Sequence, residues 1–347
     1  MAAHGGPNHA ELDALELRYE DVLDFSVSTN PYGPAPQMRQ AVLSAAIDQY
    51  PEPSAARARE AIAEWLDVSA RGVLLGNGAA DLLWSIARAL LTPQDVALIV
   101  EPTFSELRQA CLALGAQVVE WRARAEDGFA LDLEAVSALT RQCGAKLAYL
   151  CTPNTPTGAN VRAELVSRLA QRHGDTTWIV DQSFLSLSED HGDRETAMPG
   201  NVILLRSLTK DHTLPGLRVG YLVTTPRRAA LIDRQRAAWS SSAMAQAAAI
   251  AATQLDAFVA ESRDRLLDDR RQLAADLQAF GLTVVPSRAS YVLAHVDDAS
   301  RVREVLLSRH HVMIRSCASF GLPEMVRIAA RPSADRARLI EALRQVL

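Results

Sequence analysis

Short apolar runs alternate with amphipathic stretches along the first two thirds of the chain. Apolar residues recur at helical spacing over 56–66 and 79–91. Apolar runs that end in polar or turn residues predict six strands, at 72–75, 96–100, 117–120, 147–150, 177–180 and 202–205. This alternation is typical of an α/β fold built on a mainly parallel sheet.

The pattern changes after about Trp239. Long helices rich in Ala, Arg and Asp are predicted over 243–280, strands at 283–285 and 291–296, and a last helix at 333–346 with Ser333 as its N-cap. These elements predict a smaller α+β domain. We expect an N-terminal arm over 1–40 that reaches the active site and the small domain, a large domain over 41–240 and a small domain over 241–347.

Composition and charge narrow the functional classes. The chain has 347 residues, 48% of them hydrophobic, and a net charge of -5, so nucleic acid is not an expected partner. Its apolar runs are shorter than a membrane span, and its polar start is unlike a signal peptide, which predicts a cytoplasmic protein without a membrane partner. Four scattered cysteines predict neither a metal site nor disulfides.

The segment after the strand at 202–205 carries the strongest chemical signal. Lys210 stands between hydroxyl residues and an arginine, so an amine lies beside an anion site. Ser207 and Thr209 can donate hydrogen bonds to phosphate oxygens, and Arg218 can clamp them with two parallel bonds. A nearby cation also favours the neutral amine that attacks an aldehyde. Lys210 is therefore the predicted catalytic residue.

Polar residues at other strand ends complete this constellation. Asp181 follows an apolar strand and can pair with a protonated ring nitrogen. The turn after 147–150 offers a hydrogen bond to a ring oxygen from Asn154 or Thr155. Small residues open the helix at 79–91, where backbone N–H groups can approach a phosphate, and an aromatic residue after 96–100 can stack on a ring. These residues are Gly78, Ala79, Ala80 and Phe104.

Six motifs in one order, GNGAAD, EPTF, PNTPTG, DQSF, SLTK and PGLRVGY, resemble fold-type I pyridoxal-phosphate (PLP) enzymes of the aminotransferase class I/II group. Within that group the chain is most similar to histidinol-phosphate aminotransferases and threonine-phosphate decarboxylases. The resemblance implies a three-layer large domain, a PLP Schiff base on Lys210 and an amino-acid substrate. It also implies a homodimer with shared active sites, in which Tyr50 reaches the phosphate of the partner subunit's PLP.

Two further segments resemble the decarboxylase branch. They are His4-Gly-Gly followed by residues 24–33, and the late stretch 314–323 with the arginines after it. By this resemblance Arg327 binds the α-carboxylate with help from Asn30. His4 and Arg331 face a second anionic group of the substrate.

Several positions depart from the family pattern and leave the reaction open. Thr155 stands where the family has an asparagine, Gln182 where it has an acid, and Asp211 and His212 follow the lysine. Transamination is the first expectation. Decarboxylation of a phosphoamino acid and β/γ-elimination or replacement remain alternatives. A catalytically idle PLP-binding protein is not expected, because such proteins usually carry a DNA-binding module for which 347 residues leave no room. A nucleotide-binding protein without PLP would not explain Asp181, Lys210 and Arg218.

Overall fold

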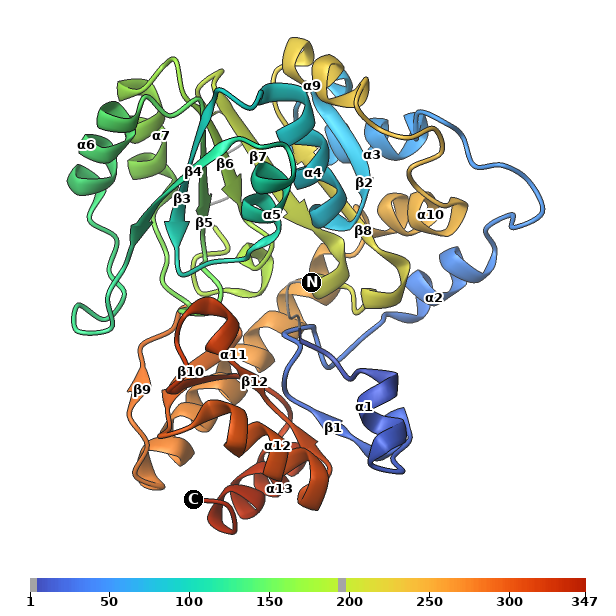
Figure 1. Cartoon of the computed structure of the whole chain (residues 1–347). Helices are drawn as coiled ribbons and strands as arrows, with labels where there is room; N and C mark the ends of the chain where they lie inside the picture. Colours follow the sequence, from blue (N-terminus) through green and yellow to red (C-terminus); the bar gives the residue numbers. More distant parts are fainter. Residues whose placement is uncertain (1–4, 193–197) are drawn as a thin grey trace.

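The computed structural model describes residues 5–192 and 198–347 and contains a large α/β domain and a smaller α+β domain (Figure 1). The large domain is built on a seven-stranded sheet within these residues. Its strands are β2 (Val73–Asn77), β3 (Val96–Glu101), β4 (Gln117–Arg122), β5 (Leu147–Cys151), β6 (Thr177–Asp181), β7 (Val202–Ser207) and β8 (Val219–Val223). Their spatial order is β2-β8-β7-β6-β5-β3-β4.

Helices cover both faces of this sheet. One face packs against α2 (Pro36–Leu43), α3 (Ala56–Leu66), α6 (Leu133–Cys143), α7 (Ala163–Arg172) and α10 (Ala243–Ala252). The other packs against α4 (Gly78–Leu90), α5 (Glu106–Ala113) and α9 (Pro226–Asp233). Because both faces are buried, the strands are apolar at successive positions rather than at alternate ones.

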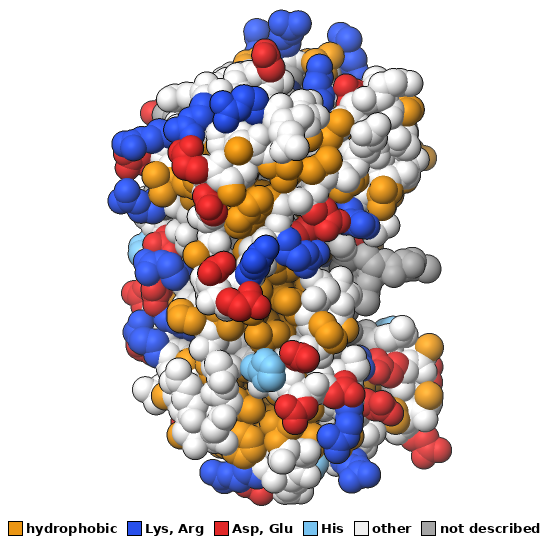
Figure 2. Space-filling view, turned by 60° about the vertical axis from the view of Figure 1, so that its left-hand side comes forward, with side chains coloured by type: hydrophobic (Ala, Val, Ile, Leu, Met, Phe, Trp, Pro, Cys, Tyr) orange, Lys and Arg blue, Asp and Glu red, His pale blue; other side chains and the backbone are white. Residues whose placement is uncertain are grey.

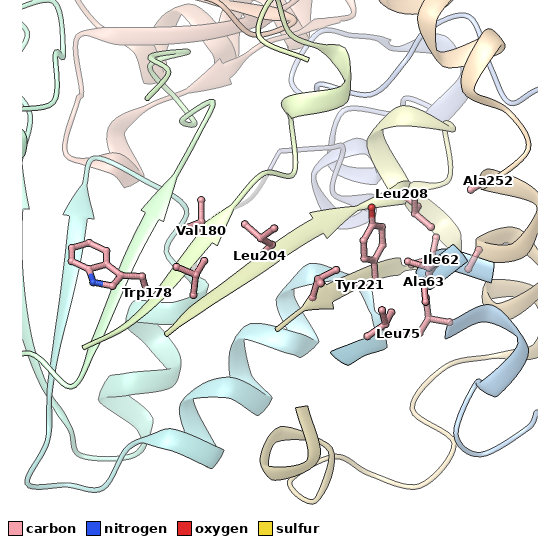
Figure 3. Close-up of a cluster of buried hydrophobic side chains, with 14 of the residues drawn as sticks. Ile62, Ala63, Leu75, Trp178, Val180, Leu204, Leu208, Tyr221 and Ala252 are labelled. Carbon is pink, nitrogen blue, oxygen red and sulfur yellow. The ribbon is translucent and has the colours of Figure 1, made fainter. Parts of the chain in front are cut away.

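Side chains of β6 illustrate this two-sided burial. Trp178 and Val180 point to one face and Ile179 to the other. Figure 3 shows the first pair with Ile62 of α3 and Ala252 of α10, in the larger core cluster. The predicted α/β class with a mainly parallel sheet is confirmed, and β8 is an additional antiparallel strand. Its five residues, four with apolar side chains and one glycine, directly follow the Pro- and Gly-containing turn of the Lys210 motif. The hydrophobic pattern alone therefore did not distinguish this strand from the turn.

The small domain joins both ends of the chain. One sheet contains β9 (Val284–Val285), β10 (Tyr291–His295), β12 (Arg315–Ser316) and β13 (Met325–Ala329). A second pairs β1 (Leu23–Asp24) with β11 (Val312–Met313) in parallel. The helices are α1 (His9–Ala14), α11 (Asp256–Ala279), α12 (Ala299–His310) and α13 (Ser333–Arg344). The N-terminal segment thus packs with elements from the end of the chain.

Two helix boundaries refine the sequence expectations. The helical stretch after 243 breaks between α10, whose alanines pack on the large sheet, and α11, whose Leu273 and Leu277 pack in the small domain. The prediction of Ser333 as an N-cap is wrong, because Pro332 takes that position and Ser333 is the first helical residue. The restricted φ of proline suits the extended cap conformation, and the Pro332 carbonyl accepts from Arg336 N–H at 3.1 Å.

On the face shown in Figure 2, basic and acidic side chains are interspersed rather than gathered by sign. No single helix in 5–192 and 198–347 is long and apolar enough to span a membrane. The α10 and α11 helices reach that length and composition only as a pair, which is bent by 80°.

Candidate active site

The sequence motifs meet at one edge of the large sheet. β2 and β7 run in the same direction because each is antiparallel to β8, and β3, β5 and β6 run parallel to β7. The carboxyl ends of these strands therefore share an edge with the amino end of β8. Open α/β sheets bind their ligands at this kind of edge.

Lys210 lies on α8 (Leu208–Asp211), a four-residue helix directly after β7. Its Nζ is 4.8 Å from the centre of the Phe184 ring. Burial lowers the pKa of the Lys210 amine below its ordinary value, and the charge of Arg218 adds to this, while Asp181 and Asp211 oppose it. A larger share of the amine is consequently neutral, which is the form that acts as a nucleophile.

The sequence contains one other lysine, Lys146. Lys146 is exposed and immediately precedes β5, so it lies at the opposite edge of the sheet from Lys210. Lys210 is therefore the lysine at this site that can form a covalent bond through its amine. Lys146 can serve as an internal reference in labelling experiments.

Asp181 ends β6 and is buried. Its Oδ2 accepts from the Tyr149 hydroxyl at 2.8 Å, and its Oδ1 accepts from the Ser183 N–H at 2.9 Å. Burial raises the pKa of Tyr149 well above its usual range, and the neighbouring Asp181 charge adds to this. Tyr149 therefore stays a donor and fixes the carboxylate. Sequence reasoning missed Tyr149, whose signal was a hydroxyl inside an otherwise apolar strand.

The residues of the predicted phosphate cradle lie close together. Gly78 has a positive φ of 79°, and a Cβ there would lie 2.7 Å from Nη2 of Arg218. Arg218 also has a positive φ, 53°, a conformation that a residue with a side chain adopts at a cost. The hydroxyls of Ser207 and Thr209 are 2.6 Å apart. Helix α4 begins at Gly78, so the N–H groups of Gly78, Ala79 and Ala80 have no partners within the helix and can bind a phosphate.

The turn after β5 orients Thr155 toward the small domain. Asn154 is held by the Thr103 hydroxyl at 2.9 Å and by the Pro102 carbonyl at 2.8 Å, so its amide organises the turn. Thr155 Oγ1 accepts from Arg327 Nη1 at 2.6 Å. The threonine that replaces the family asparagine is thus an arginine partner in this chain.

Arg327 approaches from β13 and is buried. Its Nη2 donates to the Ser26 carbonyl at 2.7 Å, and its guanidinium lies 5.2 Å from the Tyr291 ring centre. Tyr291 in turn packs edge-on against Phe184, with ring centres 5.1 Å apart. Two aromatic rings therefore connect the surroundings of Lys210 with those of Arg327.

Arg315 is a second buried arginine that sequence reasoning did not select. It lies directly opposite Arg327 in the register of β12 and β13. Its Nη2 donates to Ser319 Oγ at 2.7 Å. Burial lowers the pKa of Arg315 to about 10, and the charge of Arg327 adds to this. The available signal was a charged residue within the apolar run at 312–317.

Asn30 is fully buried beside the lysine helix. Its backbone N–H donates to the Lys210 carbonyl at 2.8 Å, and its Nδ2 donates to the Asp211 carbonyl at 3.0 Å. The structure therefore brings Asn30 to the Lys210 backbone, while its predicted help with the substrate carboxylate stays a prediction.

Four predicted residues have surroundings that do not test the roles assigned to them. Tyr50 is 81% exposed and stacks on Trp239, with ring centres 4.7 Å apart. Phe104 packs against the core under α4 and α5. Arg331 binds the Asp335 carboxylate at 2.8 Å, and His4 lies outside the described residues. The assigned roles of these four residues stay predictions.

The donor set fits PLP. PLP presents an aldehyde, a ring nitrogen and a phosphate. The site offers a deeply placed amine with a lowered pKa for the aldehyde and an anchored carboxylate at the end of the neighbouring strand for the ring nitrogen. A glycine cradle beside an arginine suits the phosphate. Within 5–192 and 198–347, no group of His, Cys, Asp and Glu side chains is arranged to hold a metal ion.

Known proteins match this chain over nearly its whole length. The family model for aminotransferase class I and II matches residues 20–346. A histidinol-phosphate aminotransferase of Symbiobacterium thermophilum is 32% identical, over 96% of this chain and 92% of its own. A threonine-phosphate decarboxylase of Salmonella typhimurium is 33% identical, over 100% of this chain and 97% of its own.

Solved structures show the same fold. The histidinol-phosphate aminotransferase of Sinorhizobium meliloti, in complex with pyridoxal-5'-phosphate, superposes with a TM-score of 0.89 at 24% identity and covers 99% of this chain and 95% of its own. The L-threonine-O-3-phosphate decarboxylase of Porphyromonas gingivalis superposes with a TM-score of 0.81 at 24% identity, over 93% of this chain and 98% of its own.

Proposed function

Because the chain belongs to the aminotransferase class I and II family, it is a PLP-dependent enzyme, and we propose that it transfers the amino group of an amino acid that carries a second anionic group. The observation that carries this proposal is the buried pair of Arg315 and Arg327 on facing strands. Like charges directly opposite each other destabilise a sheet. An anionic group of a substrate bound beside this pair would offset the repulsion.

Arg327 is particularly suited to an anionic partner. Its two hydrogen bonds are to neutral oxygens, and no carboxylate among the described residues forms an ion pair with it. Its Nε is buried and has no partner within those residues. A buried guanidinium in this state gains strongly from a carboxylate or phosphate that binds it with two parallel bonds.

The remaining residues supply the chemistry around the cofactor. Bound PLP draws electrons from the bonds of the substrate's α-carbon. Lys210 would hold the cofactor and then move the proton that leaves the α-carbon. Asp181, fixed by Tyr149, would keep a proton on the ring nitrogen. Gly78, Ser207, Thr209 and Arg218 would bind the phosphate.

Decarboxylation of a phosphoamino acid is the second candidate. The full-length similarity to the Salmonella decarboxylase supports it. Thr155 supports it as well, because its hydroxyl binds Arg327 and differs in reach from the amide of the aminotransferase pattern. The grip on the α-carboxylate decides whether a proton or CO2 leaves, so this contact bears on the choice.

The test mixes holoenzyme with amino acids, O-phosphothreonine and histidinol phosphate. Pyridoxamine phosphate together with a keto acid from an amino acid, or with a ketone from histidinol phosphate, identifies an aminotransferase. CO2 with an amine identifies a decarboxylase. We expect phosphorylated substrates to react faster than their dephosphorylated forms. The variant Arg315→Met should raise KM for the phosphorylated substrate at least tenfold and leave KM for the neutral one unchanged. Arg303→Met, which removes an arginine already paired with Glu11, is the control.

The same proposal includes a homodimer with shared active sites. The large apolar side chains most exposed to solvent include Leu43, Ile47 and Tyr50, which lie on α2 and in the loop after it. This loop projects from the large domain in Figure 1. Contact with a second subunit would cover these side chains and bring Tyr50 to the other active site.

A further inference from the structure

The helix that carries Lys210 is too short to hold itself in place. α8 has four residues, and helices of this length are unstable alone because few internal hydrogen bonds offset the lost chain entropy. The last carbonyls of any helix also lack partners within it. At its start α8 is capped by Ser207, whose hydroxyl accepts from the Thr209 N–H at 3.3 Å.

Asn30 supplies the partners at the other end of α8. Its backbone N–H donates to the carbonyl of Lys210 itself, and its side-chain Nδ2 donates to the next carbonyl, that of Asp211. These contacts join residues 180 or more positions apart in the sequence. A C-terminal cap of this kind normally comes from residues just beyond the helix.

Asn30 is itself held from both sides. Its Oδ1 accepts from the Tyr32 N–H at 2.9 Å, and its carbonyl accepts from the Thr213 hydroxyl at 2.6 Å. Its side chain is completely buried. The amide is therefore committed to backbone groups on both sides, an arrangement that suits a fixed support better than a ligand that must meet an incoming substrate.

The segment that contains Asn30 also reaches the substrate side. Four residues earlier, the Ser26 carbonyl accepts from Arg327 Nη2, and Phe25 exchanges backbone hydrogen bonds with Met313 and Ala329 of the small domain. The stretch 25–30 thus extends from the small-domain strands to the lysine helix.

We propose that Asn30 is a positioning residue that holds Lys210 through the backbone of α8, rather than a ligand of the substrate carboxylate. This inference rests on the proposed function of Lys210. A positioning residue and a substrate ligand have different consequences for the reaction. A support for Lys210 acts before any substrate is present, whereas a substrate ligand acts on substrate binding.

The experiment follows capture of PLP by Lys210 without substrate. PLP-free protein is mixed with PLP and quenched with borohydride at timed intervals, and mass spectrometry measures the reduced adduct on Lys210 relative to Lys146. The variants are Asn30→Ala and Asn30→Asp, which remove the donor to Asp211. Asn201→Ala is the matched control, because Asn201 Nδ2 also binds three backbone carbonyls, at 2.9–3.0 Å, but lies at the start of β7.

We expect the Asn30 variants to slow Lys210 capture and to lower kcat, each by roughly tenfold or more, because displacement of a reacting group is costly. KM for the amino substrate should stay within about threefold. Asn201→Ala should leave capture unchanged. Normal capture in the Asn30 variants, or a raised KM with unchanged kcat, would overturn the proposal.

A second variant and the wild-type protein distinguish failure of this proposal from failure to fold and from failure of the proposed function. If Asn30→Ala does not fold, Thr213→Val removes the hydroxyl that anchors the Asn30 carbonyl, and it should slow capture in the same direction by a smaller factor. Unchanged capture in this variant would count against the proposal. Wild-type protein that forms no adduct on Lys210 would instead contradict the proposed function.

Discussion

At the scale of single residues, the charges around Lys210 set its reactivity. Burial favours the neutral amine, and Arg218 acts in the same direction, whereas Asp181 and Asp211 favour the ammonium form. Neighbouring groups therefore act in opposite directions on the pKa of the lysine. This makes its titration a direct probe of the arrangement.

The first prediction concerns that titration. In PLP-free protein, Arg218→Met removes a like charge and should raise the pKa of Lys210, while Asp181→Asn removes an opposite charge and should lower it. The pH dependence of acetic anhydride labelling at Lys210, with Lys146 as reference, measures both shifts. Equal midpoints in the three proteins would show that neither charge acts on the amine.

His212 is a second residue whose environment has a measurable consequence. It is 2% exposed, and its Nδ1 has no hydrogen-bond partner within the described residues. Burial lowers the pKa of His212 to about 4, and the opposing attraction of Asp256 is weaker. The imidazole is consequently neutral in the folded protein at neutral pH.

The second prediction follows from this neutrality. Between pH 6.5 and about 4 the unfolded chain binds a proton at His212 that the folded chain does not, so the folded state loses stability as the pH falls. The loss attributable to His212 approaches about 3 kcal/mol. His212→Gln should lose correspondingly less in urea unfolding across this range. His9→Gln, at an exposed position on α1, should behave like the wild type.

At the scale of elements, the site depends on how closely β8 approaches the start of α4. A Cβ on Gly220 would lie 2.8 Å from the Ala79 nitrogen and 2.9 Å from the Arg206 carbonyl oxygen. Both contacts are with backbone atoms, which cannot rotate away. Glycine at this position therefore lets α4 pack against the strands that carry the site.

The third prediction tests this packing. Gly220→Ala should lower the free energy of unfolding by about 2 kcal/mol and weaken PLP binding, because the N–H groups at the start of α4 must move. Gly174→Ala, where no atom lies within 4 Å of the added Cβ, should change stability by less than about 0.5 kcal/mol. Urea midpoints and PLP titration report the two effects. A Gly220→Ala midpoint equal to that of Gly174→Ala would refute the packing argument.

At the scale of the whole molecule, exposed aromatic residues mark the surface expected to meet a second subunit. Trp239 has a positive φ of 54°, is 47% exposed, and stacks on the more exposed Tyr50. This stacking holds Tyr50 in place while its ring remains mostly uncovered. The arrangement suits a residue presented to another chain.

The fourth prediction separates the ring of Tyr50 from its hydroxyl. Tyr50→Phe keeps the stacking on Trp239, so holoenzyme should still sediment at twice the 37.7 kDa of one chain. Loss of a hydrogen bond to a charged phosphate should weaken PLP binding about tenfold. Tyr19→Phe, at an exposed position in the N-terminal segment, should change neither property. Wild-type sedimentation at the mass of one chain would contradict the shared site.

The sequence by itself determined the fold class and predicted the chemical groups of the site. Apolar runs predicted six sheet strands, and the residues that follow five of them, Lys210 and Asp181 among these, come together because parallel strands end at one edge. These signals are local, since a strand and its terminal residue are neighbours in the chain.

Only the tertiary structure decided which distant residues support those groups. The Asn30 cap on α8, the Tyr149 hydroxyl on Asp181 and the pairing of Arg315 with Arg327 depend on contacts between separate elements. A buried hydroxyl, amide or guanidinium has the same sequence signal whether it stabilises a core or serves a site. Its role follows from what packing places beside it, because burial removes water and leaves the neighbouring protein groups as its partners.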